Sequence, residues 1–144
     1  MPTELAHIAQ ANRCQKVLAY LCQGQEDLSD WAAVLAFYKA LHVIEAVFAV
    51  DQNILHGRHH TQRAKYLKSK KYQDLWRSYR PLLAAARVAR YLEDDKGKAH
   101  ATFNAYLPPG SLASQLLMPN LVVLEKTAED FLSQSAKKAL DRYK

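Results

Sequence analysis

The sequence predicts an all-α protein, an up-and-down helical bundle of four main helices plus short helices. Apolar residues recur at three- and four-residue steps through most of the chain, and no segment alternates as a strand does. Glycine and proline are scarce, with four Gly and five Pro in 144 residues, and no internal repeat is present. Because a chain of this length buries a core without disulfides or metal, we expect a single domain over residues 1–144.

The first half of the chain predicts two long helices. Residues 3–23 follow a helical apolar repeat that ends near Gly24. A central helix is expected from about residue 30 to residue 52, with Ser29 or Asp30 as its N-cap. This segment has no Gly or Pro and is apolar on nearly every side, which is typical of a helix in the middle of a bundle.

Two further helices are expected over residues 59–69 and 72–92. The second shows a clear helical repeat of Leu, Trp, Tyr and Ala residues, with Pro81 inside it. Because proline lacks an amide donor, it is expected to kink this helix or to mark a restart.

The last third of the chain begins with a break in periodicity. Residues 93–110 predict a long loop or a helix–loop excursion. Ser111 is expected to cap a short turn through Leu117, and Pro119 to begin a final helix that extends to about Tyr143.

The sequence carries no sign of export or of a membrane. It has no secretory signal at its start and no uninterrupted apolar run of membrane-spanning length. Cys14 and Cys22 are eight residues apart, which separates them by about 12 Å on one helix and prevents a disulfide. A reduced, cytoplasmic protein is expected.

Positive charge is concentrated in one block. The chain carries a net charge of +6, and residues 58–90 hold ten Lys and Arg residues against one acid, Asp74. Such a block indicates an anionic partner, namely RNA, nucleotide phosphates or an acidic protein, although a solvated helix face has the same composition. The predicted basic patch consists of Lys65, Lys68, Lys70 and Lys71.

Aromatic residues are interleaved with this positive charge, which is the composition of surfaces that stack bases while cations follow phosphates. The same spacing fits a helical core, and we expect two of them, Trp76 and Tyr79, to be buried. The four aromatic residues are Tyr66, Tyr72, Trp76 and Tyr79.

A polar seam runs along the central helix, where Tyr38, His42 and Glu45 are spaced i, i+4, i+7. An imidazole held by a carboxylate can act as a general base, and guanidinium groups bind phosphate in bidentate fashion. The candidate catalytic residues are His42, Glu45 and His60; the candidate phosphate-binding residues are Arg63, Arg87 and Arg90; Tyr38 and Tyr91 are supporting residues.

The favoured alternative is structural. Here Glu45 pairs with Arg63, Arg87 or Arg90 in a buried network that fixes the helix packing, and His42 is hydrogen-bonded in the core.

Three histidines around Gly57 invite a metal interpretation, but their spacing matches no zinc motif. These are His56, His59 and His60, and surface residues are the simpler interpretation. We therefore predict no metal and no cofactor.

Three short segments carry a family resemblance: residues 37–49 (FYKALHVIEAVFA), 59–67 (HHTQRAKYL) and 79–92 (YRPLLAAARVARYL). Together they resemble the HEPN domains of prokaryotes over roughly residues 28–92. The matching positions are Tyr38, His42 and Glu45, then His60 and Arg63, then Arg87, Arg90 and Tyr91. The resemblance implies a four- or five-helix bundle, frequently a homodimer, that acts on or binds RNA or nucleotides. Many such domains work in toxin–antitoxin and defence systems, often beside a minimal nucleotidyltransferase.

One departure from that family separates the functional hypotheses. Its ribonucleases carry an Arg-x(4–6)-His motif, and no Arg in this chain is followed by a His at that spacing. The resemblance therefore implies RNA or nucleotide binding without the usual ribonuclease activity, and without the acceptor tyrosine that follows the motif in some toxins. The alternatives are a divergent metal-independent endoribonuclease that uses His42 or His60 as its base, and an interaction module for a nucleotidyltransferase partner.

Overall fold

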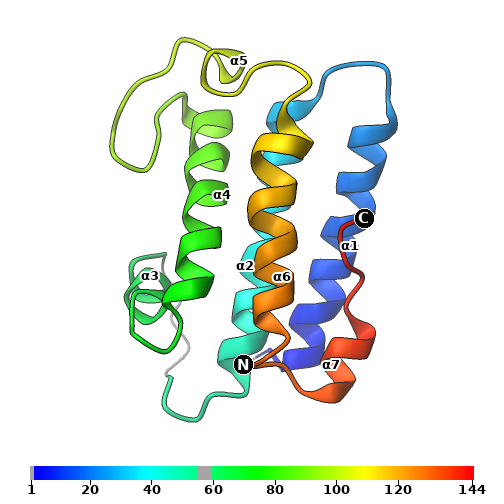
Figure 1. Ribbon diagram of the computed structural model, residues 1–144, viewed down its shortest axis with the longest axis vertical. Helices are drawn as coiled ribbons and strands as arrows, with labels where there is room; N and C mark the ends of the chain where they lie inside the picture. The colour runs from blue at the N-terminus through cyan, green and yellow to red at the C-terminus, as the bar shows by residue number, and fades with distance from the viewer. Residues whose placement is uncertain (1, 55–59) are drawn as a thin grey trace.

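The computed structural model describes residues 2–54 and 60–144, and within them it confirms the all-α bundle (Figure 1). A single isolated β-bridge, Glu93 to Ala99, is the one strand-like pairing in the described part of the chain. The long elements are α1 (Glu4–Gln23), α2 (Ser29–Ala49), α4 (Gln73–Tyr91) and the continuous pair η1 (Ala113–Val122) and α6 (Val123–Ala128). The short helices are α3 (His60–Leu67), α5 (Phe103–Tyr106) and α7 (Gln134–Ala139).

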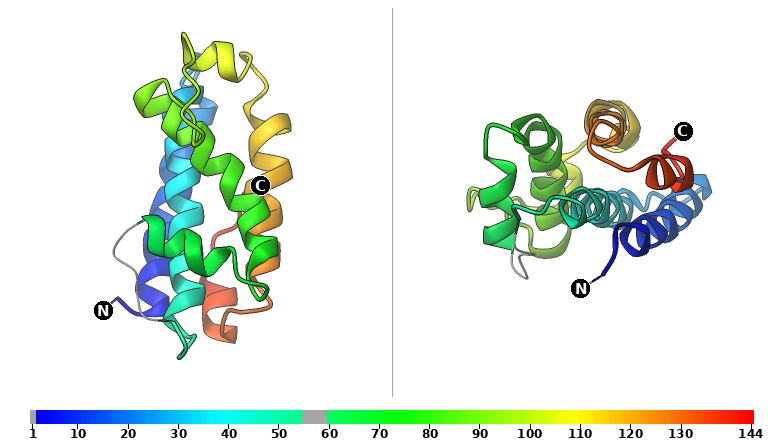
Figure 2. Two further views of the ribbon diagram at one scale, coloured as in Figure 1. Left: turned by 90° about the vertical axis from the view of Figure 1, so that its left-hand side faces the viewer. Right: turned by 90° about the horizontal axis from the view of Figure 1, so that it is seen from below.

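Helix α2 lies in the centre of the bundle, as its composition predicts. The view from below shows α1 on one side of it, α4 on the other, and α6 across from it (Figure 2). Phe37, Val43, Ile44 and Phe48 of this helix are completely buried or nearly so. Among the described helices, α2 alone is long and apolar enough to cross a membrane, but most of it is buried inside the bundle, which fits a soluble protein.

Two details of the helices differ from the sequence prediction, the N-cap of α2 and the effect of Pro81. Helix α2 begins at Ser29 with Leu28 in the N-cap position, so neither Ser29 nor Asp30 is the cap. Instead, the Asp27 carboxylate accepts a hydrogen bond from the Ser29 backbone N–H at 3.0 Å. Helix α4 continues through Pro81, so the proline does not mark the restart of a second helix.

The C-terminal third contains the largest correction. Pro119 does not begin a final helix; it lies inside η1, a ten-residue π-helical run that continues directly into α6. That helix ends at Ala128, and Ser133 caps a separate helix α7 by accepting from the Ala136 N–H at 3.2 Å. The wider i→i+5 hydrogen bonding of a π-helix is a rearrangement that the apolar pattern of a sequence does not reveal.

The last residues form a non-helical tail that runs beside α1 (Figure 1). The side chain of Asn12 holds it at two points, because its Nδ2 donates to the Ala139 carbonyl at 2.8 Å and its Oδ1 accepts from the Asp141 N–H at 2.7 Å. The final helix predicted to Tyr143 therefore ends at Ala139.

Candidate nucleic-acid interface

The polar seam of α2 does not converge on one point, because its three side chains meet three different helices. Glu45 is buried and pairs with Arg63 of α3, whose Nε lies 2.7 Å from the Glu45 Oε1. The buried Tyr79 of α4 adjoins this pair: burial raises the pKa of its hydroxyl, and the nearby Arg63 charge opposes the shift. Of the three arginines considered for Glu45, Arg63 is thus the partner.

His42 faces α1. Its Nδ1 lies 3.1 Å from the Nδ1 of His7, so one ring donates this hydrogen bond and the other accepts it. Burial lowers the pKa of His42, and the neighbouring His7 and Arg63 lower it further, against the opposing effect of Glu45. His42 is therefore neutral at pH 7, with one of its two ring nitrogens engaged by His7.

This histidine pair makes stability depend on pH. In the unfolded chain His42 takes up a proton near its ordinary pKa of about 6.5, whereas the folded protein resists protonation to a lower pH. The stability that neutral His42 contributes is fully present above that ordinary pKa and is lost as the pH falls below it. We expect the free energy of unfolding, measured by urea titration between about pH 7.5 and about pH 5, to fall toward acid, by at most about 1.4 kcal/mol per pH unit for one proton.

The variant His42→Gln should flatten this acid limb. His100→Gln is the matched control, because His100 faces a carboxylate, Asp94 at 3.1 Å, rather than a second imidazole. An unchanged slope in His42→Gln would contradict the assignment.

Arg90 and Arg87 lie at the end of α4 among aromatic rings. The Arg90 guanidinium carbon lies 5.6 Å from the Phe37 ring, 5.9 Å from Tyr38 and 5.1 Å from Tyr91. Its Nε donates to the Ala86 carbonyl at 3.1 Å and its Nη1 lies 3.4 Å from the Tyr38 hydroxyl. No carboxylate of the described residues pairs with it, so its positive charge is not cancelled.

The Arg87 guanidinium carbon also lies near the Tyr91 ring, at 5.6 Å. Its Nε is buried and has no hydrogen-bond partner in the described part of the chain. The Tyr91 ring is 61% exposed, an unusual position for a large aromatic side chain that two arginines contact. This end of α4 therefore presents an exposed ring with two guanidinium groups near it, at 5.6 Å and 5.1 Å.

These residues belong to a longer strip along α4, which we call the α4 strip. Its residues follow one another at i, i+4, i+7, i+11 and i+15, all half-buried or exposed: Trp76, Arg80, Leu83, Arg87 and Tyr91. The strip is about 22 Å long at 1.5 Å per residue. Two arginines and a leucine lie between an aromatic ring at each end of the strip, an arrangement that was not predicted from the sequence.

A lysine from the turn after α3 lies at the end of the strip that Trp76 forms. Lys68 Nζ lies 5.0 Å from the centre of the Trp76 ring. Lys65, Lys68 and Lys70 are exposed and have no carboxylate partner among the residues described. Of the predicted basic patch, Lys71 differs, because its Nζ lies 3.2 Å from Asp51.

The interleaved aromatic residues divide between core and surface. Tyr72 and Tyr79 are buried, so the prediction for Tyr79 is confirmed, whereas Trp76 is only half-buried and the prediction for it is corrected. Tyr66 is also half-buried and packs edge-on against Phe48. Trp76 keeps part of its ring at the surface because it lies on the outward side of α4, beneath Lys68.

Some predicted residues lie outside the part of the chain that the structure describes. These are His56 and His59, together with the side chain of His60, whose backbone begins α3. The catalytic role predicted for His60 therefore stays a prediction.

The structure contains a second buried ion pair that the sequence analysis missed. Lys39 of α2 is completely buried, and its Nζ lies 2.6 Å from Glu125 of α6 and 2.6 Å from the Gln15 amide oxygen of α1. Glu125 also accepts from the Tyr143 backbone N–H at 3.1 Å. Burial lowers the pKa of Lys39 and raises the pKa of Glu125, and in each case the charge of the partner opposes the shift. A lysine inside a helix that is apolar on all sides was the signal available.

Comparisons with known proteins found no family model, no curated protein and no solved structure that matches this chain.

Proposed function

We propose that this chain is a HEPN-like domain that binds single-stranded RNA, or a nucleotide, along the α4 strip and the lysines beside it. The observation that carries the proposal is a cation over a partly exposed ring at each end of the strip, Lys68 over Trp76 and Arg87 over Tyr91.

The chemistry favours a single strand over a duplex. Unpaired bases expose their faces, and each can stack on a side-chain ring such as Tyr91 or the exposed part of Trp76. The cations between the rings then lie where successive phosphates pass. Stacking and phosphate contacts are tolerant of sequence, so we expect little base preference.

Three of the arginines contribute differently. Arg87 has no carboxylate partner among the described residues, whereas Arg80 is partly neutralised by Asp95, whose Oδ2 lies 3.1 Å from the Arg80 Nε. Arg63 is buried against Glu45, so the proposal places no phosphate on it.

The test is fluorescence anisotropy with a labelled single-stranded RNA, titrated between about 50 and 200 mM salt. Tyr91→Ala should weaken binding about 5- to 150-fold, the loss expected for one stacked base. Arg87→Gln should weaken it and reduce the slope of log affinity against log salt by about one, because one fewer counterion is released.

Arg77→Gln is the matched control. Arg77 lies on the same helix with the same charge, but it is not one of the strip residues and it pairs with Asp74 at 3.2 Å. If it weakens binding as much as Arg87→Gln, the affinity comes from general positive charge and the strip is not the site. The proposal also fails if the wild type binds no RNA at the lowest salt.

The endoribonuclease alternative is supported by the environment of His42. Burial lowers the pKa of its imidazole, and a base must be unprotonated to accept a proton. Gel analysis of the RNA from the same titrations separates the two functions. Cleavage that His42→Ala abolishes, with helicity unchanged by circular dichroism, would establish the enzyme; intact RNA leaves the binding function.

A homodimeric state, a place in a toxin–antitoxin or defence system and a nucleotidyltransferase partner belong to this proposal through the family resemblance. A cytoplasmic location belongs to it because Cys14 and Cys22 are both free thiols. Sizing of the purified chain and co-purification of a second chain test the two assemblies.

A further inference from the structure

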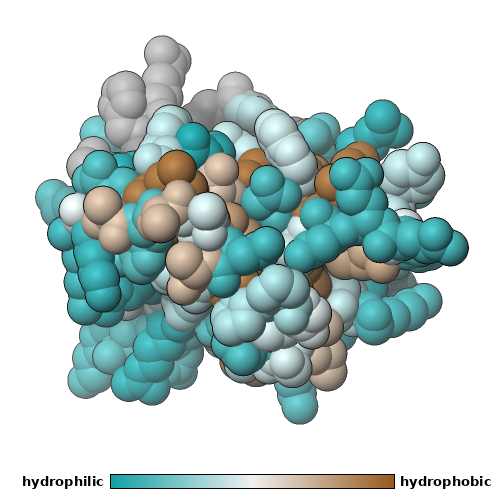
Figure 3. All heavy atoms as spheres, turned by 90° about the horizontal axis from the view of Figure 1, so that it is seen from above, coloured by the Kyte–Doolittle hydropathy of each residue, from teal (hydrophilic) through white to brown (hydrophobic). Residues whose placement is uncertain are grey.

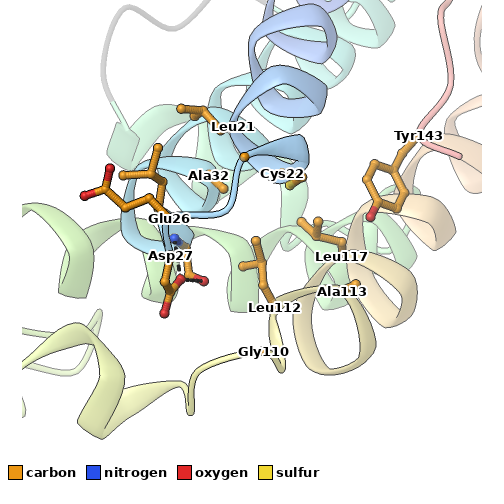
Figure 4. A pocket seen from close by; sticks show the side chains of 13 residues that line it. Leu21, Cys22, Glu26, Asp27, Ala32, Gly110, Leu112, Ala113, Leu117 and Tyr143 are labelled. Atoms are coloured by element: carbon orange, nitrogen blue, oxygen red, sulfur yellow. Dashed lines mark hydrogen bonds between the residues drawn. The ribbon is translucent and has the colours of Figure 1, made fainter.

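A cavity of about 350 Å³ opens at the end of the bundle opposite α3 (Figure 4). It lies between the end of α1, the turn into α2, the beginning of η1 and the C-terminal tail. This volume falls within the range of sites for small molecules. No residue of the α4 strip lines it, so it is independent of the proposed RNA interface.

The floor of this cavity is apolar. Leu112, directly before η1, and Leu117 of η1 lie between Tyr143 on one side and the α1–α2 turn on the other, as Figure 4 shows. Leu21, Leu28 and Ala32 complete the floor. From above, this end of the molecule shows separate brown patches framed by hydrophilic atoms rather than one continuous apolar surface (Figure 3). A small molecule fits that arrangement better than a protein surface does.

The rim of the cavity is acidic in a protein that is basic as a whole. Glu26 and Asp27 line it, and no lysine or arginine of the described residues does. The Asp27 Oδ1 accepts from both the backbone N–H and the hydroxyl of Ser29, and these hydrogen bonds hold the pKa of the carboxyl below its usual range. Asp27 is therefore ionised at neutral pH.

The cavity borders the beginning of α2, but this does not make it a site for anions. The beginning of a helix favours anions, but here the Ser29 N–H at that position is already engaged by Asp27. The other oxygen of Asp27, Oδ2, and the carboxylate of Glu26 accept no hydrogen bond from any described residue. Two carboxylates with accepting capacity thus border an apolar cavity.

We propose that this cavity binds a small organic amine, with its apolar or aromatic body on the leucines and its ammonium group between Glu26 and Asp27. The ammonium would donate to the Asp27 Oδ2 and to Glu26, while the body displaces water from Leu112 and Leu117.

The test uses the thiol at the cavity as its reporter. Cys22 lines the cavity and is exposed, whereas Cys14 is buried, so alkylation by a maleimide reports on Cys22. We expect tryptamine to slow this alkylation and indole-3-acetate, which carries the same ring with a negative charge, to leave it unchanged. Calorimetry with the same two compounds gives their affinities directly.

Two variants test separately the role of the two carboxylates and the role of the space in the cavity. Glu26→Gln with Asp27→Asn should weaken tryptamine about tenfold, the loss expected for a charge-assisted hydrogen bond, while Asn keeps the Oδ1 acceptor that Ser29 uses. Ala113→Phe, at an exposed position in the lining, should fill the cavity and abolish binding of the amine. Circular dichroism confirms that each variant is folded, and Tyr91→Ala should bind tryptamine as the wild type does.

The proposal is overturned if indole-3-acetate protects Cys22 as well as tryptamine does, if the charge variant binds tryptamine unchanged, or if Ala113→Phe still binds it.

Discussion

Lys39→Met is expected to destabilise the protein by about 3–5 kcal/mol, because it leaves the buried Glu125 carboxylate without the charge that compensates it. The variant would then fold only if Glu125 takes up a proton or if water enters the core around it. Urea unfolding at neutral pH measures the loss.

The double variant Lys39→Met with Glu125→Leu is expected to recover most of that stability, since replacing both members of a buried pair by apolar residues is often neutral or stabilising. Lys16→Met on the exposed side of α1 is the control and should change the free energy of unfolding by less than about 0.5 kcal/mol. A single Lys39→Met variant as stable as the wild type would contradict the buried pairing.

Arg63→Met is expected to cost a similar amount, about 3–5 kcal/mol, because Glu45 is only 6% exposed and its Oε1 loses the Arg63 Nε. The same variant distinguishes a structural arginine from one that binds phosphate. Measured where the variant is still folded, its affinity for RNA should equal that of the wild type, in contrast to Arg87→Gln.

Glu45→Leu combined with Arg63→Met should restore stability and leave RNA affinity unchanged. If Arg63→Met instead loses RNA affinity while its unfolding free energy is unchanged, Arg63 binds phosphate as the sequence analysis first proposed.

The sequence was sufficient for the central helix because its signal is local. Twenty residues from Trp31 to Val50 without Gly or Pro, apolar on all sides, require a helix surrounded by others, and α2 is in the centre of the bundle. The prediction for the C-terminal third was wrong, and the reason is also local. Proline is common in the first turn of a helix, so Pro119 was placed there, although in the structure η1 begins six residues earlier.

The partners of the buried polar residues could not be predicted from the sequence, for a different reason. A charge inside an apolar helix predicts that a partner exists, but the partner of Lys39 lies on α6 and that of His42 on α1. Their identity depends on how the helices pack, which one sequence alone does not determine. The α4 strip was missed because Trp76 was expected in the core and Tyr91 was considered only beside the arginines.

The position of Glu125 and of the tail also has a consequence for the order of events during synthesis. Domains generally acquire structure as the chain emerges from the ribosome. Lys39 emerges early, yet the carboxylate that neutralises it, and the Tyr143 N–H that this carboxylate accepts from, emerge more than eighty residues later. The interior around α2 therefore cannot be sealed before Glu125 and Tyr143 have been synthesised, and the final desolvation of this helix follows translation of the tail.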